Sequence, residues 1–214
     1  MIPSPHTIFF ISLRIDVLLE FLAALLGLTI SLLSLEASRR LGSRTLLYLG
    51  LGFLLMALAM LSRTIAVTAL LSAGSLPEIG RLGIISQLIT LELLYSVIRI
   101  SSYIVFIYLY VTTPPAPRSI PALAAIIFNP SFELVSAILL LPVVYRTGQN
   151  SLGSDNPFAW TVFTGFALLL ASHLAFLFSG QSFTFYLAGH LLQLLALSLF
   201  FLALVLVRSD EKRV

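Results

Sequence analysis

The stretch Phe183–Val207, FTFYLAGHLLQLLALSLFFLALVLV, contains no Asp, Glu, Lys or Arg residue. A bilayer core about 30 Å thick is crossed by roughly 20 apolar residues in an α-helix, so this stretch is long enough to span a membrane. Strands of a membrane β-barrel alternate apolar and polar side chains, whereas this leucine-dense stretch does not. The stretch therefore predicts a transmembrane helix.

The composition of the whole chain agrees with a membrane protein. Of its 214 residues, 59% are hydrophobic and 10% are charged, and the mean hydropathy is +1.06. A soluble domain carries about 25% charged residues, so a disordered chain and a water-soluble globule are both excluded. The net charge of +3 comes without a run of Lys and Arg, which excludes a nucleic-acid-binding protein. The lack of cysteine excludes disulfides, iron–sulfur clusters and thiolate metal sites.

Five further apolar stretches of helical length precede this one. We therefore expect an all-α, polytopic membrane helical bundle with about six transmembrane helices, one integral membrane domain over residues 1–214 and no soluble domain. The protein is expected to pass several times through the cell membrane, with lipid and other membrane subunits, or further copies of itself, as partners. The predicted spans cover residues of about 8–35, 45–71, 83–111, 120–145, 158–179 and 183–207.

Basic residues give two conflicting indications of orientation. Loop 38–44 and tail 208–214 each contain three basic residues, and the positive-inside rule marks both as cytoplasmic. Five spans separate the two segments, so a chain with six spans would place them on opposite faces of the membrane. The fourth span is the weakest of the six, because Asn129 and Pro130 divide it into two short apolar halves.

Charged residues within the spans are candidates for function, because each costs several kcal/mol in lipid and normally faces protein or water. The first span carries Asp16 and Glu20, four residues apart and so on one helical face. The third span carries Glu92 and Arg99, which lie about 10 Å apart along a helix. That separation is too large for a direct pair, so each is expected to contact a neighbouring helix.

A polar and aromatic stripe on the third span contains both of these residues. Candidate partners for Arg99 are Asp16, Glu20 and Glu133. The stripe could form a polar seam between helices, or it could line a proton path or a ligand cavity. It consists of Glu92, Ser96, Arg99, Tyr103, Phe106 and Tyr110, whose spacing of three and four residues keeps them on one face.

Glu133 follows closely after Asn129 and Pro130 in the fourth span. A proline frees a backbone carbonyl, and a freed carbonyl beside a carboxylate resembles the broken helices of transporters. A small transporter is therefore one hypothesis for the chain. No repeat-related second break supports it elsewhere in the sequence.

His173 and His190 lie at similar distances on either side of the predicted Gly180–Ser182 turn. In an antiparallel hairpin they are expected at the same depth, roughly 10–13 Å from the turn. Two histidines at one depth could ligate the iron of haem b or hydrogen-bond a quinone. Alternatively they are structural, and each imidazole hydrogen-bonds a hydroxyl or backbone group of another helix. The sequence indicates no metal site.

Two stretches carry a resemblance to known membrane proteins. Ser38–Phe53, SRRLGSRTLLYLGLGF, resembles the first hairpin of uncharacterised multi-span archaeal membrane proteins. Gly189–Leu197, GHLLQLLAL, is similar to the last span of the membrane sensor regions that precede kinase or cyclase modules. Because no such module follows Val214, the resemblance implies that the chain would signal through a partner.

No recognisable catalytic motif is present: the sequence has no Walker loop, no Gly-x-Ser-x-Gly and no His-Glu-x-x-His. We therefore expect no catalytic residue. The first hypothesis is a non-enzymatic, sensor-like or accessory subunit of a larger membrane complex. The second is a redox subunit in which His173 and His190 hold haem b or contact quinone, and the third is the small transporter.

Overall fold

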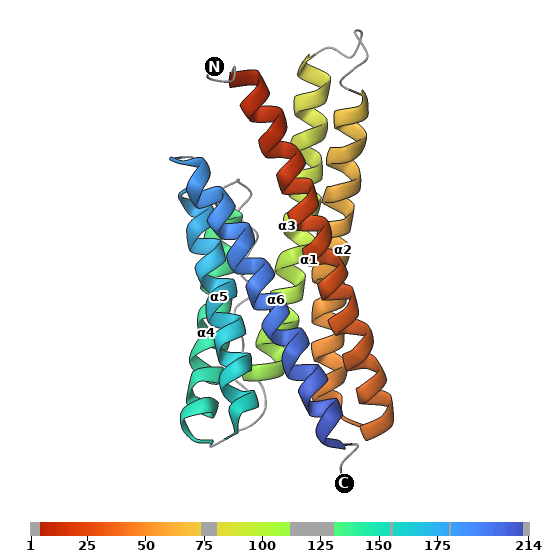
Figure 1. The fold of residues 1–214 in the computed structure, drawn as a ribbon, viewed down its shortest axis with the longest axis vertical. Coiled ribbons are helices and arrows are strands. Elements are labelled where there is room, and N and C mark those ends of the chain that lie inside the picture. The colour runs from red at the N-terminus through yellow and green to blue at the C-terminus, as the bar shows by residue number, and fades with distance from the viewer. Residues whose placement is uncertain (1–4, 74–80, 112–130, 155, 180, 212–214) are drawn as a thin grey trace.

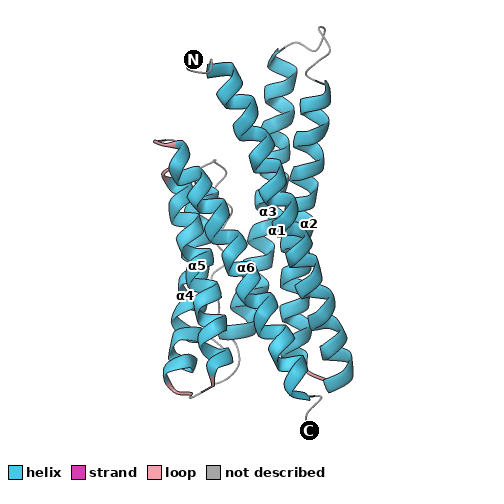
Figure 2. Cartoon of the chain, in the orientation of Figure 1, coloured by secondary structure: helices cyan, strands magenta, loops and turns pink. Residues whose placement is uncertain are grey.

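The described residues form six helices (Figure 1). The computed structural model describes residues 5–73, 81–111, 131–154, 156–179 and 181–211, and no strand occurs in these ranges (Figure 2). The expectation of an all-α membrane bundle is thereby confirmed. The helices are α1 (Pro5–Leu41), α2 (Arg44–Ala73), α3 (Arg81–Val111), α4 (Ser131–Leu152), α5 (Pro157–Leu177) and α6 (Phe183–Glu211).

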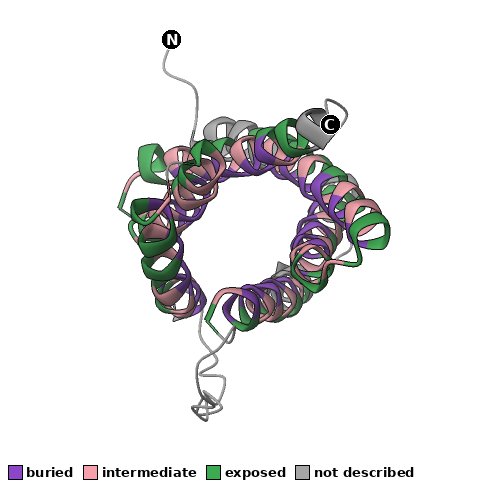
Figure 3. Cartoon of the chain, turned by 90° about the horizontal axis from the view of Figure 1, so that it is seen from below, coloured by how far each residue is buried: buried purple, intermediate pink, exposed green. Residues whose placement is uncertain are grey.

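The six helices form a closed ring. Each helix packs against the next in sequence, and α6 packs against α1 to complete the ring (Figure 3). Buried side chains lie on the inner faces, whereas large apolar side chains such as Leu32, Ile65 and Leu141 are more than half exposed on the outside. An apolar outer surface of this kind is compatible with lipid and unfavourable in water.

Five of the described helices are long and apolar enough to cross a membrane, and α4 is not among them. The fourth span was expected over 120–145, but the described helix begins at Ser131 and continues to Leu152. Its last turns carry Arg146, Gln149 and Asn150, which lowers the hydropathy of the whole helix. Asn129 and Pro130 lie outside the described residues. The five candidate spans are Val17–Leu41, Arg44–Ala69, Thr90–Val111, Pro157–Leu177 and Phe183–Val207.

The course of α4 removes the conflict over orientation. Figure 1 shows that α4 runs in the same direction as α3, so it ends at the same end of the bundle as the α1–α2 turn. Helix α5 runs back, and α6 then ends at that end of the bundle too. Leu204 and Val207 of α6 accordingly line a small pocket together with Leu46 of α2. The α1–α2 turn and the described end of α6, which a six-span chain would place on opposite faces, therefore lie at one end of the bundle. By the positive-inside rule, that end is predicted to be cytoplasmic.

The α1–α2 turn is shorter than the sequence suggested. Helix α1 continues through most of the predicted loop 38–44 and stops at Leu41. Gly42 follows with a φ of 63°, a left-handed conformation that ends helices and that glycine adopts without steric cost. Ser43 then leads directly into α2, so the two helices are joined by a tight turn.

Four phenylalanines close the centre of the ring. Phe53, Phe106, Phe166 and Phe200 come from α2, α3, α5 and α6, and each is at most 3% exposed. Their ring centroids lie 4.7 to 5.4 Å apart around the group. We call these four residues the phenylalanine cluster. Gly165 permits the packing, because a Cβ there would lie 2.8 Å from the Phe200 ring.

Single cysteines introduced into this cysteine-free chain test the orientation. We expect Gln181→Cys, in the α5–α6 turn, to react with a membrane-impermeant maleimide on intact cells. Ser43→Cys and Asn150→Cys should react only after permeabilisation, because both lie at the arginine-rich end of the bundle. Labelling of Asn150→Cys from outside would contradict the direction of α4, and it is the result that a regular six-span topology requires.

Candidate functional site

A triad of charged residues joins α1, α2 and α3. Arg63 donates from Nη1 to Glu20 Oε2 and from Nε to Glu92 Oε1, both at 2.6 Å. The Glu20 side chain is 2% exposed, that of Arg63 14% and that of Glu92 32%. We call these three residues the Arg63 triad. It contains two carboxylates and one guanidinium, and it joins three helices through buried charges.

Arg63 was not among the candidate residues expected from the sequence. It is the one charged residue in the predicted span 45–71, so the signal was available from composition alone. The two carboxylates of the triad were identified, but neither was assigned to this partner. Glu92 and Glu20 do face protein, as expected of charges in a span. The side chain of Asp16 lies outside the described part of the chain.

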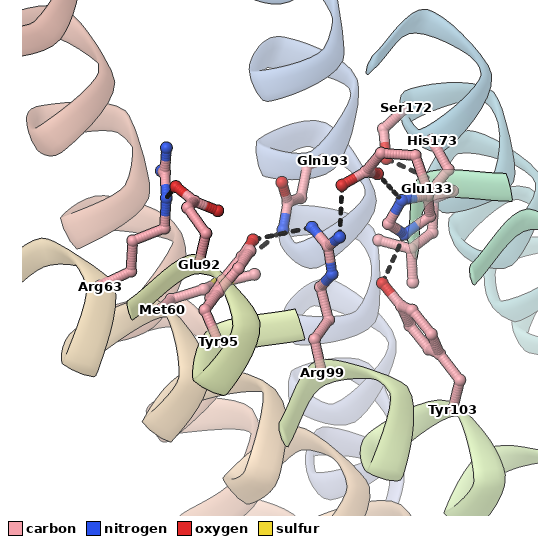
Figure 4. A network of polar contacts seen from close by, with 11 residues as sticks. Met60, Arg63, Glu92, Tyr95, Arg99, Tyr103, Glu133, Ser172, His173 and Gln193 are labelled. Atoms are coloured by element: carbon pink, nitrogen blue, oxygen red, sulfur yellow. Dashed lines mark hydrogen bonds and ion pairs between the residues drawn. The ribbon is translucent and has the colours of Figure 1, made fainter. Parts of the chain in front are cut away.

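A second network surrounds Arg99 and is centred on Glu133 (Figure 4). Arg99 is 2% exposed, and its Nη2 donates to Glu133 Oε1 in the first turn of α4. Glu133 was one of the three partners predicted for Arg99, and the structure selects it. Arg99 Nη1 donates to the Tyr95 hydroxyl at 2.9 Å, and its Cζ lies 4.6 Å from the Tyr95 ring centroid. This cation–π contact adds to the stabilisation of the buried charge.

His173 extends this network to α5. Its Nδ1 lies 2.6 Å from Glu133 Oε2, and its Nε2 lies 2.5 Å from the Tyr103 hydroxyl. A neutral imidazole satisfies both contacts, since Nδ1–H donates to the carboxylate and Nε2 accepts the hydroxyl proton. We call Tyr95, Arg99, Glu133, His173 and Tyr103 the Glu133 network. The structural alternative for His173, a hydrogen bond to a hydroxyl of another helix, matches this geometry.

His190 lies near His173 on the neighbouring helix but belongs to different surroundings. The Phe176 ring contacts both imidazoles, at centroid distances of 4.8 Å to His190 and 6.4 Å to His173. Gly189 makes room for this ring, because a Cβ at that position would lie 2.6 Å from it. The Tyr186 ring packs against His190 at 4.8 Å. The two histidines are thus separated by aromatic packing.

A haem ligated by both histidines does not fit this arrangement. An axial ligand must direct one imidazole nitrogen at the iron, and both nitrogens of His173 are engaged by Glu133 and Tyr103. The Phe176 ring also fills space that a macrocycle between the histidines would need. Within the described residues, no group of three His, Cys, Asp or Glu side chains could hold a metal ion.

A cavity of about 460 Å³ lies between the two groups of charged residues. His190 is among the described residues that line it, and His173 is not, so the two histidines do not form one ligand site. Phe176 and Leu177 provide an apolar part of the wall. The polar part includes Arg63, Glu92, Tyr95, Arg99, Glu133 and Tyr186.

The cavity extends toward the end of the bundle that holds the α5–α6 turn. Its wall extends to Ser179 in the α5–α6 turn, at the end opposite the arginine-rich face. In the other direction, Phe106 of the phenylalanine cluster lies seven residues beyond Arg99, about 10 Å further along α3. The phenylalanine cluster therefore closes the centre of the ring beneath the cavity.

Replacement of Arg99 by alanine should destabilise the protein strongly. The change leaves the Glu133 carboxylate without its guanidinium, which costs about 3–5 kcal/mol in a buried pair. Arg40→Ala is the matched control, because Arg40 pairs with Glu36 on the surface with 64% and 42% of the two side chains exposed. That exposed pair contributes at most about 1 kcal/mol. Chemical unfolding in lipid nanodiscs measures both, and equal losses would mean that Arg99 is hydrated.

Comparison with known proteins supplies no relative. No protein-family model matches the chain, and neither do the curated proteins or the solved structures. The function of the molecule must therefore be inferred from its cavity, the charged residues that line the cavity and the phenylalanine cluster below it.

Proposed function

We propose that this chain is a non-enzymatic, sensor-like membrane protein that binds a small polar molecule in its cavity and acts together with a partner subunit. The observation that carries the proposal is the cavity itself. Two arginines and two glutamates line it within the depth of the predicted spans. Ionisable groups at that depth are costly and usually mark a ligand or ion pathway.

The phenylalanine cluster below the cavity favours the binding of a ligand over its passage through the bundle. A channel needs a continuous polar path, but Phe53, Phe106, Phe166 and Phe200 meet in the centre of the ring below the charged residues. A sensor needs a site that is accessible from one face and coupled to the rest of the protein. The walls of the cavity come from α2 and α3 on one side and from α4, α5 and α6 on the other, so a bound ligand would contact both parts of the bundle.

The expected orientation gives the direction of entry. If the arginine-rich end faces the cytoplasm, the cavity opens to the outside of the membrane. An external ligand and an internal output are the arrangement of a sensor. The resemblance of Gly189–Leu197 to the last span of membrane sensor regions agrees with this role, and His190 within that stretch lines the cavity.

A ligand screen on the protein in lipid nanodiscs tests the proposal. The probes are amino acids, amines, carboxylates and sugars, and the readout is the midpoint of thermal unfolding. At a hundredfold excess over Kd, a bound ligand stabilises the folded state by about 2.7 kcal/mol. We expect at least one class of probe to raise the midpoint in a concentration-dependent way.

Two tryptophan variants provide the control for this screen. Ser179→Trp narrows the mouth of the cavity and should abolish the stabilisation, whereas Asn150→Trp, at the opposite end of the bundle, should preserve it. Stabilisation that is unaffected by Ser179→Trp would place the ligand elsewhere and contradict the proposal. Accumulation of the bound probe inside proteoliposomes would show that the chain is a transporter instead.

A further inference from the structure

The α1–α2 turn places three arginines at the edge of the apolar spans. The candidate span of α1 ends at Leu41, and that of α2 begins at Arg44. Arg39 and Arg40 belong to the last turn of α1, and Arg44 is the first residue of α2. Because no polar loop separates these arginines from the spans, their guanidinium groups are expected at the depth of the lipid headgroups.

The turn is held by its own hydrogen bond, which keeps Arg39 and Arg44 together. The Ser38 hydroxyl donates to the Ser43 carbonyl oxygen at 2.9 Å, across the left-handed Gly42. Arg39 directly follows the first of these serines in the sequence, and Arg44 directly follows the second. The hydrogen bond between the serines therefore fixes the backbone of both arginines at one tight turn.

Two of the three arginines have no anionic partner in the described part of the chain. Arg40 pairs with Glu36, whereas Arg39 and Arg44 are exposed and neither forms an ion pair with a described carboxylate. Two like charges at one turn repel each other, so an anion placed against both would be favourable. Guanidinium groups bind phosphate especially well, because they can donate two parallel hydrogen bonds to its oxygens.

The position of Arg44 strengthens the case for an external anion. The N-terminus of a helix carries a partial positive charge, so it favours an anion and disfavours a cation. The first turn of α2 contains no acidic residue, and its first residue is this arginine. An anion bound there would compensate the guanidinium and the helix terminus together.

Apolar side chains at the same turn distinguish a lipid from a free phosphate. Leu41 lies between the arginines in the sequence and is 54% exposed, and Leu47 in the next turn of α2 is also exposed. Contact with hydrocarbon removes such side chains from water, which is favourable in proportion to the apolar area covered. A phospholipid offers a phosphate to the arginines and acyl chains to the leucines, whereas a free phosphate offers nothing to the leucines.

We infer that the α1–α2 turn is a binding site for an anionic phospholipid, with its headgroup phosphate at Arg39 and Arg44 and its acyl chains against Leu41 and Leu47. The inference goes beyond the proposed function and does not depend on a ligand in the cavity. The predicted orientation places the turn at the cytoplasmic leaflet, whose anionic lipids attract basic side chains. A zwitterionic lipid fits less well, because its own cationic group already compensates the phosphate.

Lipid retention measured by native mass spectrometry tests the inference. The protein is reconstituted in nanodiscs of three parts phosphatidylcholine to one part phosphatidylglycerol, and the lipids that stay bound after release are counted. We expect the wild-type protein to retain phosphatidylglycerol in preference to phosphatidylcholine. Arg39→Gln and Arg44→Gln should each lower this preference about fivefold, as expected for the attraction of one basic side chain to anionic lipid. Equal retention of the two lipids by the wild-type protein would overturn the inference.

Arg146→Gln is the matched control, because it removes the same charge from the same end of the bundle. Arg146 is exposed near the end of α4, and its Nη1 donates to the neutral Gln149. We expect this variant to keep the preference for phosphatidylglycerol. An equal loss in all three variants would mean that the whole basic end attracts anionic lipid, and it would overturn the assignment to the α1–α2 turn.

Soluble glycerol phosphate separates a lipid site from a site for free phosphate esters. It shares the phosphate of the lipid but lacks the acyl chains. Added in excess over phosphatidylglycerol, it should leave the number of retained lipids unchanged. Displacement of the lipid by glycerol phosphate would show that the arginines bind a soluble anion, and the lipid inference would then be wrong.

Discussion

The burial of Arg99 is the constraint on which the arrangement of the helices depends. Its guanidinium lies 2% exposed in the interior of a membrane bundle, where an uncompensated charge costs several kcal/mol. Glu133 supplies the compensating charge, and it can do so only when the first turn of α4 lies against the middle of α3. The same carboxylate accepts from His173, so one side chain connects α3, α4 and α5. The Arg63 triad connects α1, α2 and α3 in the same way.

These polar contacts matter because apolar packing alone specifies little in a membrane. Lipid tails are as apolar as leucine, so helices gain specificity from close packing at small residues and from interhelical hydrogen bonds. Gly52 receives the Phe106 ring of α3, and Gly165 receives the Phe200 ring of α6. The ring of six helices is therefore held by two ion-pair groups near its open end and by the phenylalanine cluster in its centre.

The sequence predicts the class of fold and part of the site, but it does not predict which side chains pair between helices or the direction of α4. The approximate positions of α1, α2, α3, α5 and α6 follow from runs of apolar residues, and Arg99 was expected to bind a carboxylate of another helix. The choice of Glu133 over Glu20 depends on which helices are neighbours, and spacing along one helix contains no such information. The path of α4 was mistaken for the same reason. Its apolar content suggested a regular crossing, whereas tertiary contacts place it parallel to α3.

The histidines illustrate how a correct depth can accompany a misleading chemical interpretation. His173 and His190 both contact the Phe176 ring, so they lie in neighbouring positions, as their similar distances from the α5–α6 turn predicted. The hydrogen bonds of His173, however, are made with residues from α3 and α4 that lie far away in the sequence. Because Tyr103 and Glu133 occupy both nitrogens of His173, this residue supports the buried Glu133 carboxylate from the side opposite Arg99. The position of the Arg99 guanidinium is therefore tied, through one carboxylate, to both α4 and α5.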